Sequence, residues 1–161
     1  MQKASKDKDV ALFWSHNKKD HPEWLDSIMK NSPQFVWWDV AWTLKTKPRL
    51  PCSGYIWSTV DRPTGVTHKA LIVEIDPRPT EQRIQEVIQS WQESKIHFNE
   101  NSPLLLYKKK QKPRCTLLKL KNLHELTNPG RLDDFALVST EISPKQGPQS
   151  HYIVFDPIQH D

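Results

Sequence analysis

Residues 34–50 combine aromatic side chains and cations at unusual density. The aromatic residues are Trp37, Trp38 and Trp42, and the cations that follow are Lys45, Lys47 and Arg49. Stacking of a nucleobase on an aromatic ring contributes about 1–3 kcal/mol and suits any base. Lysine and arginine neutralise the flanking phosphates. This stretch therefore predicts a slot for a nucleotide, with indole walls beside a phosphate-binding loop.

Adjacent Trp37 and Trp38 cannot line the same slot if their segment is extended, because successive side chains of a strand point to opposite faces. The sequence leaves open which of the two faces the slot. Three more aromatic residues on predicted strands are candidates to border it: Trp14, Tyr55 and Trp57. Polar candidates for reading the edge of a base are Ser15, His16, Asn17 and Asp39. Further candidates for phosphate contact are Lys18, Lys19, Arg62, Lys109 and Lys110.

Each candidate also has a purely structural interpretation. Trp24 and Trp91 lie on apolar helix stripes and are assigned to the core. Core packing is also favoured for Trp14 and Trp57. Asp39 is as suited to fixing a loop as to reading a base. The lysines around residue 109 are typical of a solvated turn.

Size and composition limit the class of protein. The chain has 161 residues, a net charge of +4 and two cysteines. No apolar run approaches the roughly 20 residues of a membrane span, and the N-terminus lacks the apolar core of a signal peptide. Two cysteines without metal-type spacing fit a reducing compartment. We therefore expect a cytoplasmic protein with no membrane partner.

Hydrophobic periodicity predicts short strands and two helices. The clearest helix covers residues 80–95, where Ile84, Val87, Ile88 and Trp91 repeat with helical spacing and Thr80 is a suitable N-cap. Residues 54–60 and 67–75 predict a hairpin. The remaining predicted elements are a helix from 21 to 31 and strands at 10–14, 35–38, 103–107, 115–120 and 151–156.

This element order predicts an α+β fold. We expect a small, partly closed β-barrel of five or six strands, with the helices packed outside. Residues 1–9 are polar and expected to be disordered. Residues 10–158 are expected to form one domain.

The element order and three local motifs resemble the PUA-like superfamily, and its EVE and YTH branches in particular. The motifs are WDVA at residues 38–41, GYI at 54–56 and DFAL at 134–137. The glycine and the Arg-Asn pair that follow the EVE-type Trp-Asp are missing here. Residues 80–95 fit the pattern less well and are interpreted as an inserted helix.

The resemblance implies a nucleic-acid-binding domain that flips one base, often a modified one, into an aromatic pocket. In YTH domains a tryptophan just after the first helix forms a wall of this pocket, and Trp37 or Trp38 matches that place. The partner expected first is DNA with a methylated base, within a restriction system of the McrB type, together with a nuclease or AAA+ motor. RNA binding by a PUA or ASCH-type domain is the alternative. A protein-interaction module with an exposed aromatic patch is a third interpretation.

Catalytic motifs are weak in this sequence. The best enzymatic alternative is a metal-dependent nuclease that uses Asp61, Glu74 and Asp76 as magnesium ligands. Asp76 stands where such sites place a lysine, which argues against it. Cys115 has no local histidine partner. We therefore expect a binding domain without catalytic residues, cofactor or metal.

Overall fold

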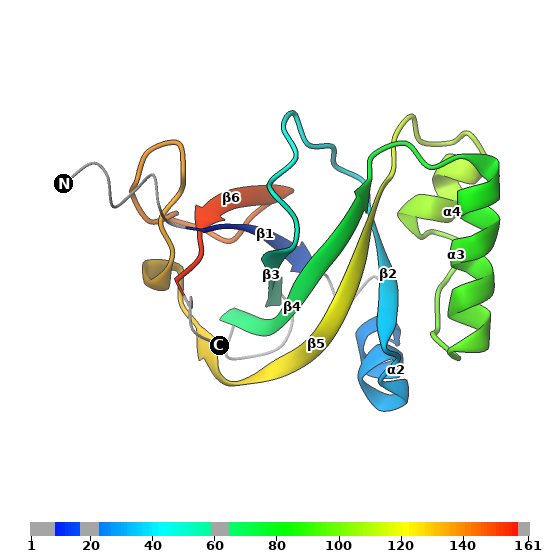
Figure 1. The fold of residues 1–161 in the computed structure, drawn as a ribbon, viewed down its shortest axis with the longest axis horizontal. Helices are drawn as coiled ribbons and strands as arrows, with labels where there is room; N and C mark the ends of the chain where they lie inside the picture. The colour runs from blue at the N-terminus through cyan, green and yellow to red at the C-terminus, as the bar shows by residue number, and fades with distance from the viewer. Residues whose placement is uncertain (1–8, 17–22, 59–64, 158–161) are drawn as a thin grey trace.

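The structure is a computed structural model that describes residues 9–16, 23–58 and 65–157. Most of the expected N-terminal tail, residues 1–8, lies outside these ranges. No helix within the described ranges is both long enough and apolar enough to cross a membrane. Figure 1 shows a curved sheet with helices gathered toward one side of it.

Six strands form one mixed sheet in the order β2-β5-β4-β3-β1-β6. They are β1 (Val10–His16), β2 (Phe35–Val40), β3 (Cys52–Ser58), β4 (Gly65–Asp76), β5 (Thr116–Gly130) and β6 (His151–Phe155). β1 runs parallel to β3, and the other neighbouring pairs are antiparallel. The α+β class agrees with the sequence-based expectation. The expected partial closure is not found in the described part of the chain, where β2 and β6 are the edges of an open sheet.

The predicted pairing of β3 with β4 is confirmed by an antiparallel register from Cys52 opposite Ile72 to Ser58 opposite Gly65. Gly54 in this pair lies under the indole of Trp14. A Cβ atom added at position 54 would approach that ring to 2.8 Å, so only glycine leaves room for it. The absence of a side chain there lets the edge of the Trp14 indole approach β3 closely, behind the site described below.

The described residues also form three α-helices and one 3-10 turn: α2 (Trp24–Asn31), α3 (Glu81–Glu93), α4 (Pro103–Lys108) and η1 (Leu132–Asp134). Thr80 caps α3 as predicted, since its Oγ1 accepts a hydrogen bond of 3.2 Å from the Arg83 amide. The buried residues of α3 are Ile84, Val87 and Trp91. The Trp91 indole donates a 2.8 Å hydrogen bond to the Trp37 carbonyl, which fastens α3 to the edge strand β2.

The strand predicted for residues 103–107 is wrong, because these residues form helix α4. Ser102 caps the helix by accepting a 3.3 Å hydrogen bond from the Leu105 amide. Pro103 occupies the first turn, where its missing amide hydrogen costs nothing. These two residues select a helix although the run of leucines also suits a strand.

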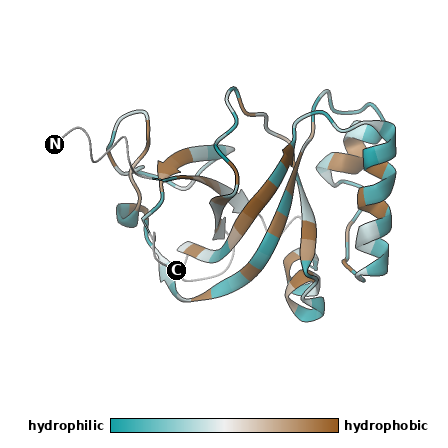
Figure 2. Ribbon diagram, in the orientation of Figure 1, coloured by the Kyte–Doolittle hydropathy of each residue, from teal (hydrophilic) through white to brown (hydrophobic). Residues whose placement is uncertain are grey.

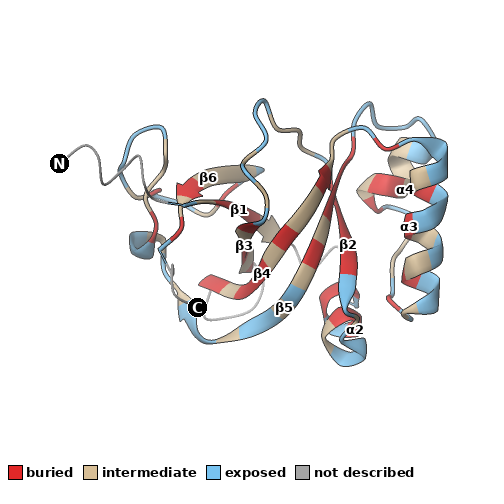
Figure 3. Ribbon diagram, in the orientation of Figure 1, coloured by how far each residue is buried: buried red, intermediate tan, exposed pale blue. Residues whose placement is uncertain are grey.

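The apolar residues form two clusters, and successive side chains of β1 and β3 alternate between them. The larger contains Trp14, Trp24, Trp38 and Trp91, and α2, α3 and α4 contribute to it or cover it. The smaller contains Phe13, Tyr55 and Phe135. Alternating hydropathy and burial along β4 and β5 are visible in Figures 2 and 3. This alternation is what lets one sheet support two cores.

Candidate functional site

The two adjacent tryptophans of β2 point to opposite faces of the sheet. Trp38 packs edge-to-face with Trp14 and Trp24, with ring centres 6.0 and 5.9 Å apart. Trp37 instead lies beneath Arg83 of α3, whose guanidinium is 4.7 Å from the ring centre. Of the two, Trp38 is therefore the one that faces a cavity.

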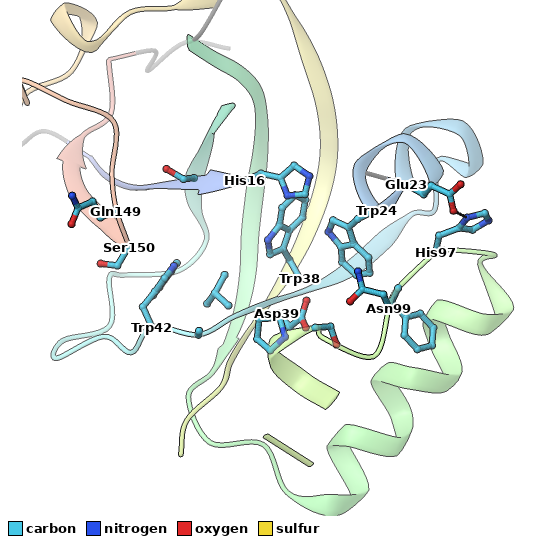
Figure 4. Close-up of a pocket in the computed structure, with 16 residues that line it drawn as sticks. His16, Glu23, Trp24, Trp38, Asp39, Trp42, His97, Asn99, Gln149 and Ser150 are labelled. Carbon is cyan, nitrogen blue, oxygen red and sulfur yellow. Dashed lines mark hydrogen bonds and ion pairs between the residues drawn. The ribbon is translucent and has the colours of Figure 1, made fainter. Parts of the chain in front are cut away.

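This cavity has a volume of about 360 Å³, which falls in the range of about 300–1,000 Å³ typical of ligand sites. Figure 4 shows the indoles of Trp24, Trp38 and Trp42 around it, with His16 against Trp38. The lining residues are Ser15, His16, Glu23, Trp24, Trp38, Asp39, Val40, Ala41, Trp42, His97, Phe98, Asn99, Ser102, Pro103, Gln149 and Ser150. The cavity therefore combines aromatic walls with several polar side chains.

The central wall is held rigid by neighbouring rings. Trp38 contacts His16, with ring centres 5.4 Å apart at 76°. Trp24 packs edge-to-face on Trp91 at 4.9 Å, which connects the wall to α3. Such tilted and edge-to-face pairs contribute about 0.5–1.5 kcal/mol beyond burial. The wall is thus preorganised and does not have to form when a ligand enters.

The second wall, Trp42, is stacked on a histidine. Its ring lies 4.2 Å from that of His151 in β6, at an angle of 26°. Burial lowers the pKa of His151 from its ordinary value of 6.5, because the charged ring loses hydration. His151 is therefore neutral at pH 7 and supports Trp42 as a flat, uncharged partner.

The polar side of the cavity is fixed by hydrogen bonds to loops. Asp39 Oδ2 accepts a 3.0 Å hydrogen bond from the Leu104 amide, which ties β2 to the start of α4. Ser15 donates from its hydroxyl to the Pro148 carbonyl. His97 Nδ1 lies 2.8 Å from Glu23 Oε2, and both side chains are exposed. Ser15 and Asp39 thus hold in place the loops that border the cavity, so both structural and ligand-reading roles remain for them.

Replacing His151 by alanine is expected to weaken ligand binding by a few-fold, because Trp42 loses a ring contact of about 0.5–1.5 kcal/mol. His151→Phe should retain ligand binding, because a phenylalanine ring can still pack against Trp42. The variants also test the pKa. The pKa of His151 is lower in the folded protein than in the unfolded chain, so on acidification the unfolded chain binds a proton more readily. The free energy of unfolding therefore falls as the pH drops below 6.5.

Urea denaturation of the wild type and of His151→Phe at pH 7.5 and pH 5 measures this effect. The loss of stability on acidification should be smaller in the phenylalanine variant. Equal losses in both proteins would contradict the buried, neutral histidine.

Several predicted pocket residues do not line the cavity. Trp14 is fully buried behind it, against Trp38 and Trp42. Tyr55 lies in the smaller core, where its hydroxyl donates to Asp156 at 2.5 Å. Trp57 packs beside Phe13 on that same side. The cavity therefore brings together Ser15, His16, Trp38, Asp39 and Trp42 of the predicted set, while Asn17 lies outside the described residues.

The predicted phosphate-binding residues split in a similar way. Lys18, Lys19 and Arg62 lie outside the described residues. Lys45, Lys47, Arg49, Lys109 and Lys110 are exposed. The chain that leads from β2 to residues 45–49 and the chain that leads from residues 109 and 110 into β5 meet the sheet side by side, because Val40 at the end of β2 pairs with Thr116 at the start of β5. Lys47 donates to the Ile75 carbonyl at 3.2 Å, which holds its loop against the end of β4.

Sequence reasoning identified five of the sixteen residues that line the cavity and missed the other eleven. Trp24 was assigned to the core alone, although it both packs and lines the wall. Residues 97–103 follow α3, the helix interpreted as an insertion, and they form another side. The polar run HFNENS between two apolar segments marks a loop, but nothing in it indicates that the loop folds back against β2.

The nuclease alternative finds little support in the described residues. Arg83 pairs with Glu74 at 2.8 Å and lies 3.8 Å from Asp76, and Asp61 lies outside the described ranges. No cluster of three or more His, Cys, Asp or Glu side chains within those ranges suits a metal ion. Burial raises the pKa of Cys52 to about 12 and raises that of Cys115 as well, so neither thiol is a ready nucleophile.

Comparison with known proteins identifies the fold. No family model matches the sequence, and no curated protein matches it either. Among solved structures, the ASCH protein from Zymomonas mobilis aligns with a TM-score of 0.51 at 17% identity, over 88% of this chain and 85% of that one. A tyrosine-to-phenylalanine mutant of that protein aligns with a TM-score of 0.50 at 19% identity, over 88% and 87%. The chain therefore has the PUA-like fold of ASCH domains, and the finer likeness to EVE and YTH domains stays a prediction from the sequence.

Proposed function

We propose that this protein is a nucleic-acid-binding domain that takes one unpaired nucleotide into the cavity beside Trp38. The observation that carries the proposal is the cavity itself, which is bounded by three indoles. One of them, Trp42, belongs to the same loop as the exposed cations Lys45, Lys47 and Arg49. The aromatic walls supply stacking for any base. The polar groups opposite supply donors and acceptors for its edge.

Single-stranded RNA is the partner that we favour. An unpaired base enters without the few kcal/mol that extrusion from a duplex costs. Sequence-specific RNA recognition generally targets unstacked bases in loops and single strands. The likeness of the fold to ASCH domains supports this choice over a reader of duplex DNA.

Recognition of a methylated base in DNA remains the second candidate. It rests on the sequence resemblance to EVE and YTH domains, and it uses the same cavity. A methyl group would add apolar contact between Trp38 and Trp42. A nuclease or AAA+ motor as the partner of such a reader is a prediction from that resemblance alone.

A binding panel distinguishes these candidates. Labelled oligonucleotides are titrated with the protein at a fixed salt concentration, and fluorescence anisotropy gives the affinities. The panel holds single-stranded RNA, single-stranded DNA and duplex DNA, with and without methylcytosine or methyladenine. We expect single-stranded RNA to bind most tightly. Preference for a methylated duplex would favour the second candidate, and weak binding of every member would contradict both.

A further inference from the structure

The outer face of the sheet carries a second group of aromatic and cationic side chains, away from the cavity. We call it the outer-face cluster; it consists of Phe35 and Trp37 on β2 and of Lys119 and Lys121 on β5. Phe35 pairs with Lys121 and Trp37 pairs with Lys119 across the two strands. All four share the face opposite Trp38, because alternate residues of a strand point the same way.

The two ammonium groups of this cluster lie over aromatic rings. Lys119 Nζ is 4.9 Å from the centre of the Phe35 ring and 5.6 Å from that of Trp37. Lys121 Nζ is 5.9 Å from the Phe35 ring. Glu74 lies opposite Lys119 in the register, but its carboxylate pairs with Arg83 at 2.8 Å. Both lysines therefore lack an ion pair within the described part of the chain.

One end of the cluster is covered and the other is open. Arg83 of α3 lies over Trp37, which is only 8% exposed. Phe35 is 39% exposed. In the described ranges, Ile142 is the other large apolar residue that is exposed to solvent. Among the described residues, the exposed ring of Phe35 thus lies beside two ammonium groups that have no ion pair.

We propose that the outer-face cluster binds a second part of the same nucleic-acid strand. Phe35 stacks on a base, while Lys119 and Lys121 exchange their contacts with the ring for contacts with phosphates. The charges favour this occupant, because two unpaired cations suit a polyanion and the flat ring between them suits a base. Sheets that bind RNA commonly use exposed aromatic residues in this way.

This inference goes beyond the proposed function by adding a separate contact region on the other side of β2. It rests on the proposed function for the choice of nucleic acid, but not on the cavity. An acidic peptide would match the two lysines without needing the ring, and the experiment below includes it as an alternative outcome.

The test compares a triple variant, Phe35→Ala with Lys119→Gln and Lys121→Gln, against a matched control. The control is Ile142→Ala with Lys145→Gln, which removes an exposed apolar residue and an exposed lysine elsewhere. Anisotropy titrations use a dinucleotide and a single-stranded RNA of roughly 20 nucleotides, which exceeds the site sizes of about 4–16 nucleotides typical of single-strand binding folds. Thermal unfolding verifies the fold, and the double lysine variant replaces the triple one if needed.

We expect the triple variant to bind the long RNA about tenfold more weakly, as loss of one stacked base and two phosphate contacts implies. The slope of log affinity against log salt should fall by about 1.4, since each phosphate contributes about 0.7 for single strands. Dinucleotide binding and the control variant should be unaffected. These results together would support the outer-face site.

Unchanged affinity and salt slope for the long RNA would overturn the inference. So would a triple variant that loses binding to polyglutamate but keeps binding to RNA. A Trp42→Ala variant, measured with the same two RNA ligands, distinguishes failure of the outer-face inference from failure of the cavity proposal. A variant that damages the cavity should weaken binding of both the dinucleotide and the long RNA. A variant that damages the outer-face cluster should weaken binding of the long RNA alone.

Discussion

Replacing Trp42 by alanine is expected to weaken binding of a single-stranded oligonucleotide by about 1–3 kcal/mol, or roughly 5- to 150-fold. Trp42 is half-buried in the loop after β2, and it forms a wall of the cavity. Its removal takes away a stacking surface but little core. Anisotropy titration of the variant and the wild type, at one salt concentration, measures the change.

Trp57→Ala is the matched control for this experiment. Trp57 is also half-buried, but it packs beside Phe13 on the other side of the sheet. Its loss should leave binding unchanged. If Trp57→Ala weakens binding as much as Trp42→Ala, the effect comes from general loosening of the fold and the assignment of Trp42 to the site is wrong.

Replacing Trp38 by alanine is expected to lower the free energy of unfolding by about 3–5 kcal/mol, as for other large-to-small changes in a core. Trp38 is 3% exposed and its ring packs on Trp14, Trp24 and His16. Since total stability is typically only about 5–15 kcal/mol, this variant is expected to be partly unfolded at 37 °C. Urea denaturation followed by circular dichroism measures the loss.

Trp38→Phe should cost less, because it keeps a ring against the same neighbours. A loss below about 1 kcal/mol for Trp38→Ala would mean that the wall is not preorganised, since surface positions typically change stability by no more than about 0.5 kcal/mol. The cavity would then have to form on binding.

The sequence predicts that Trp37 and Trp38 of β2 point to opposite faces of the sheet, but it does not predict which of them faces the cavity. Two adjacent tryptophans in an extended segment must separate, and they do. Which one faces the cavity depends on α3, because Arg83 covers the Trp37 ring and Trp91 binds the Trp37 carbonyl. These contacts join residues about 50 positions apart, and no local pattern in the sequence encodes them.

Helix α4 illustrates a local signal that the strand prediction for residues 103–107 did not take into account. The apolar run from Leu104 to Leu106 suits a strand by composition. The segment forms a helix instead, because Ser102 caps it, Pro103 suits its first turn and the Leu104 amide donates a hydrogen bond to Asp39. The last contact is long-range, so no local pattern in the sequence indicates it.

The side of the cavity built by β1, β2 and the loop after β2 was predictable, and the side built by residues 97–103 was not. Trp38 and Trp42 followed from their spacing and from the cations beside them. Phe98, Asn99 and Ser102 reach the cavity only because α3 packs across β2 and returns the chain to Asp39. The helix interpreted as an insertion thus positions part of the site.

The indole N–H signals of the tryptophans, observed by NMR during titration with single-stranded RNA, test the central claim most directly. Each signal is assigned by a single Trp→Phe variant. If a nucleotide enters the cavity, the signals of Trp24, Trp38 and Trp42 should shift together while that of Trp57 stays in place. Tight RNA binding that leaves the signals of Trp38 and Trp42 unmoved would contradict the account.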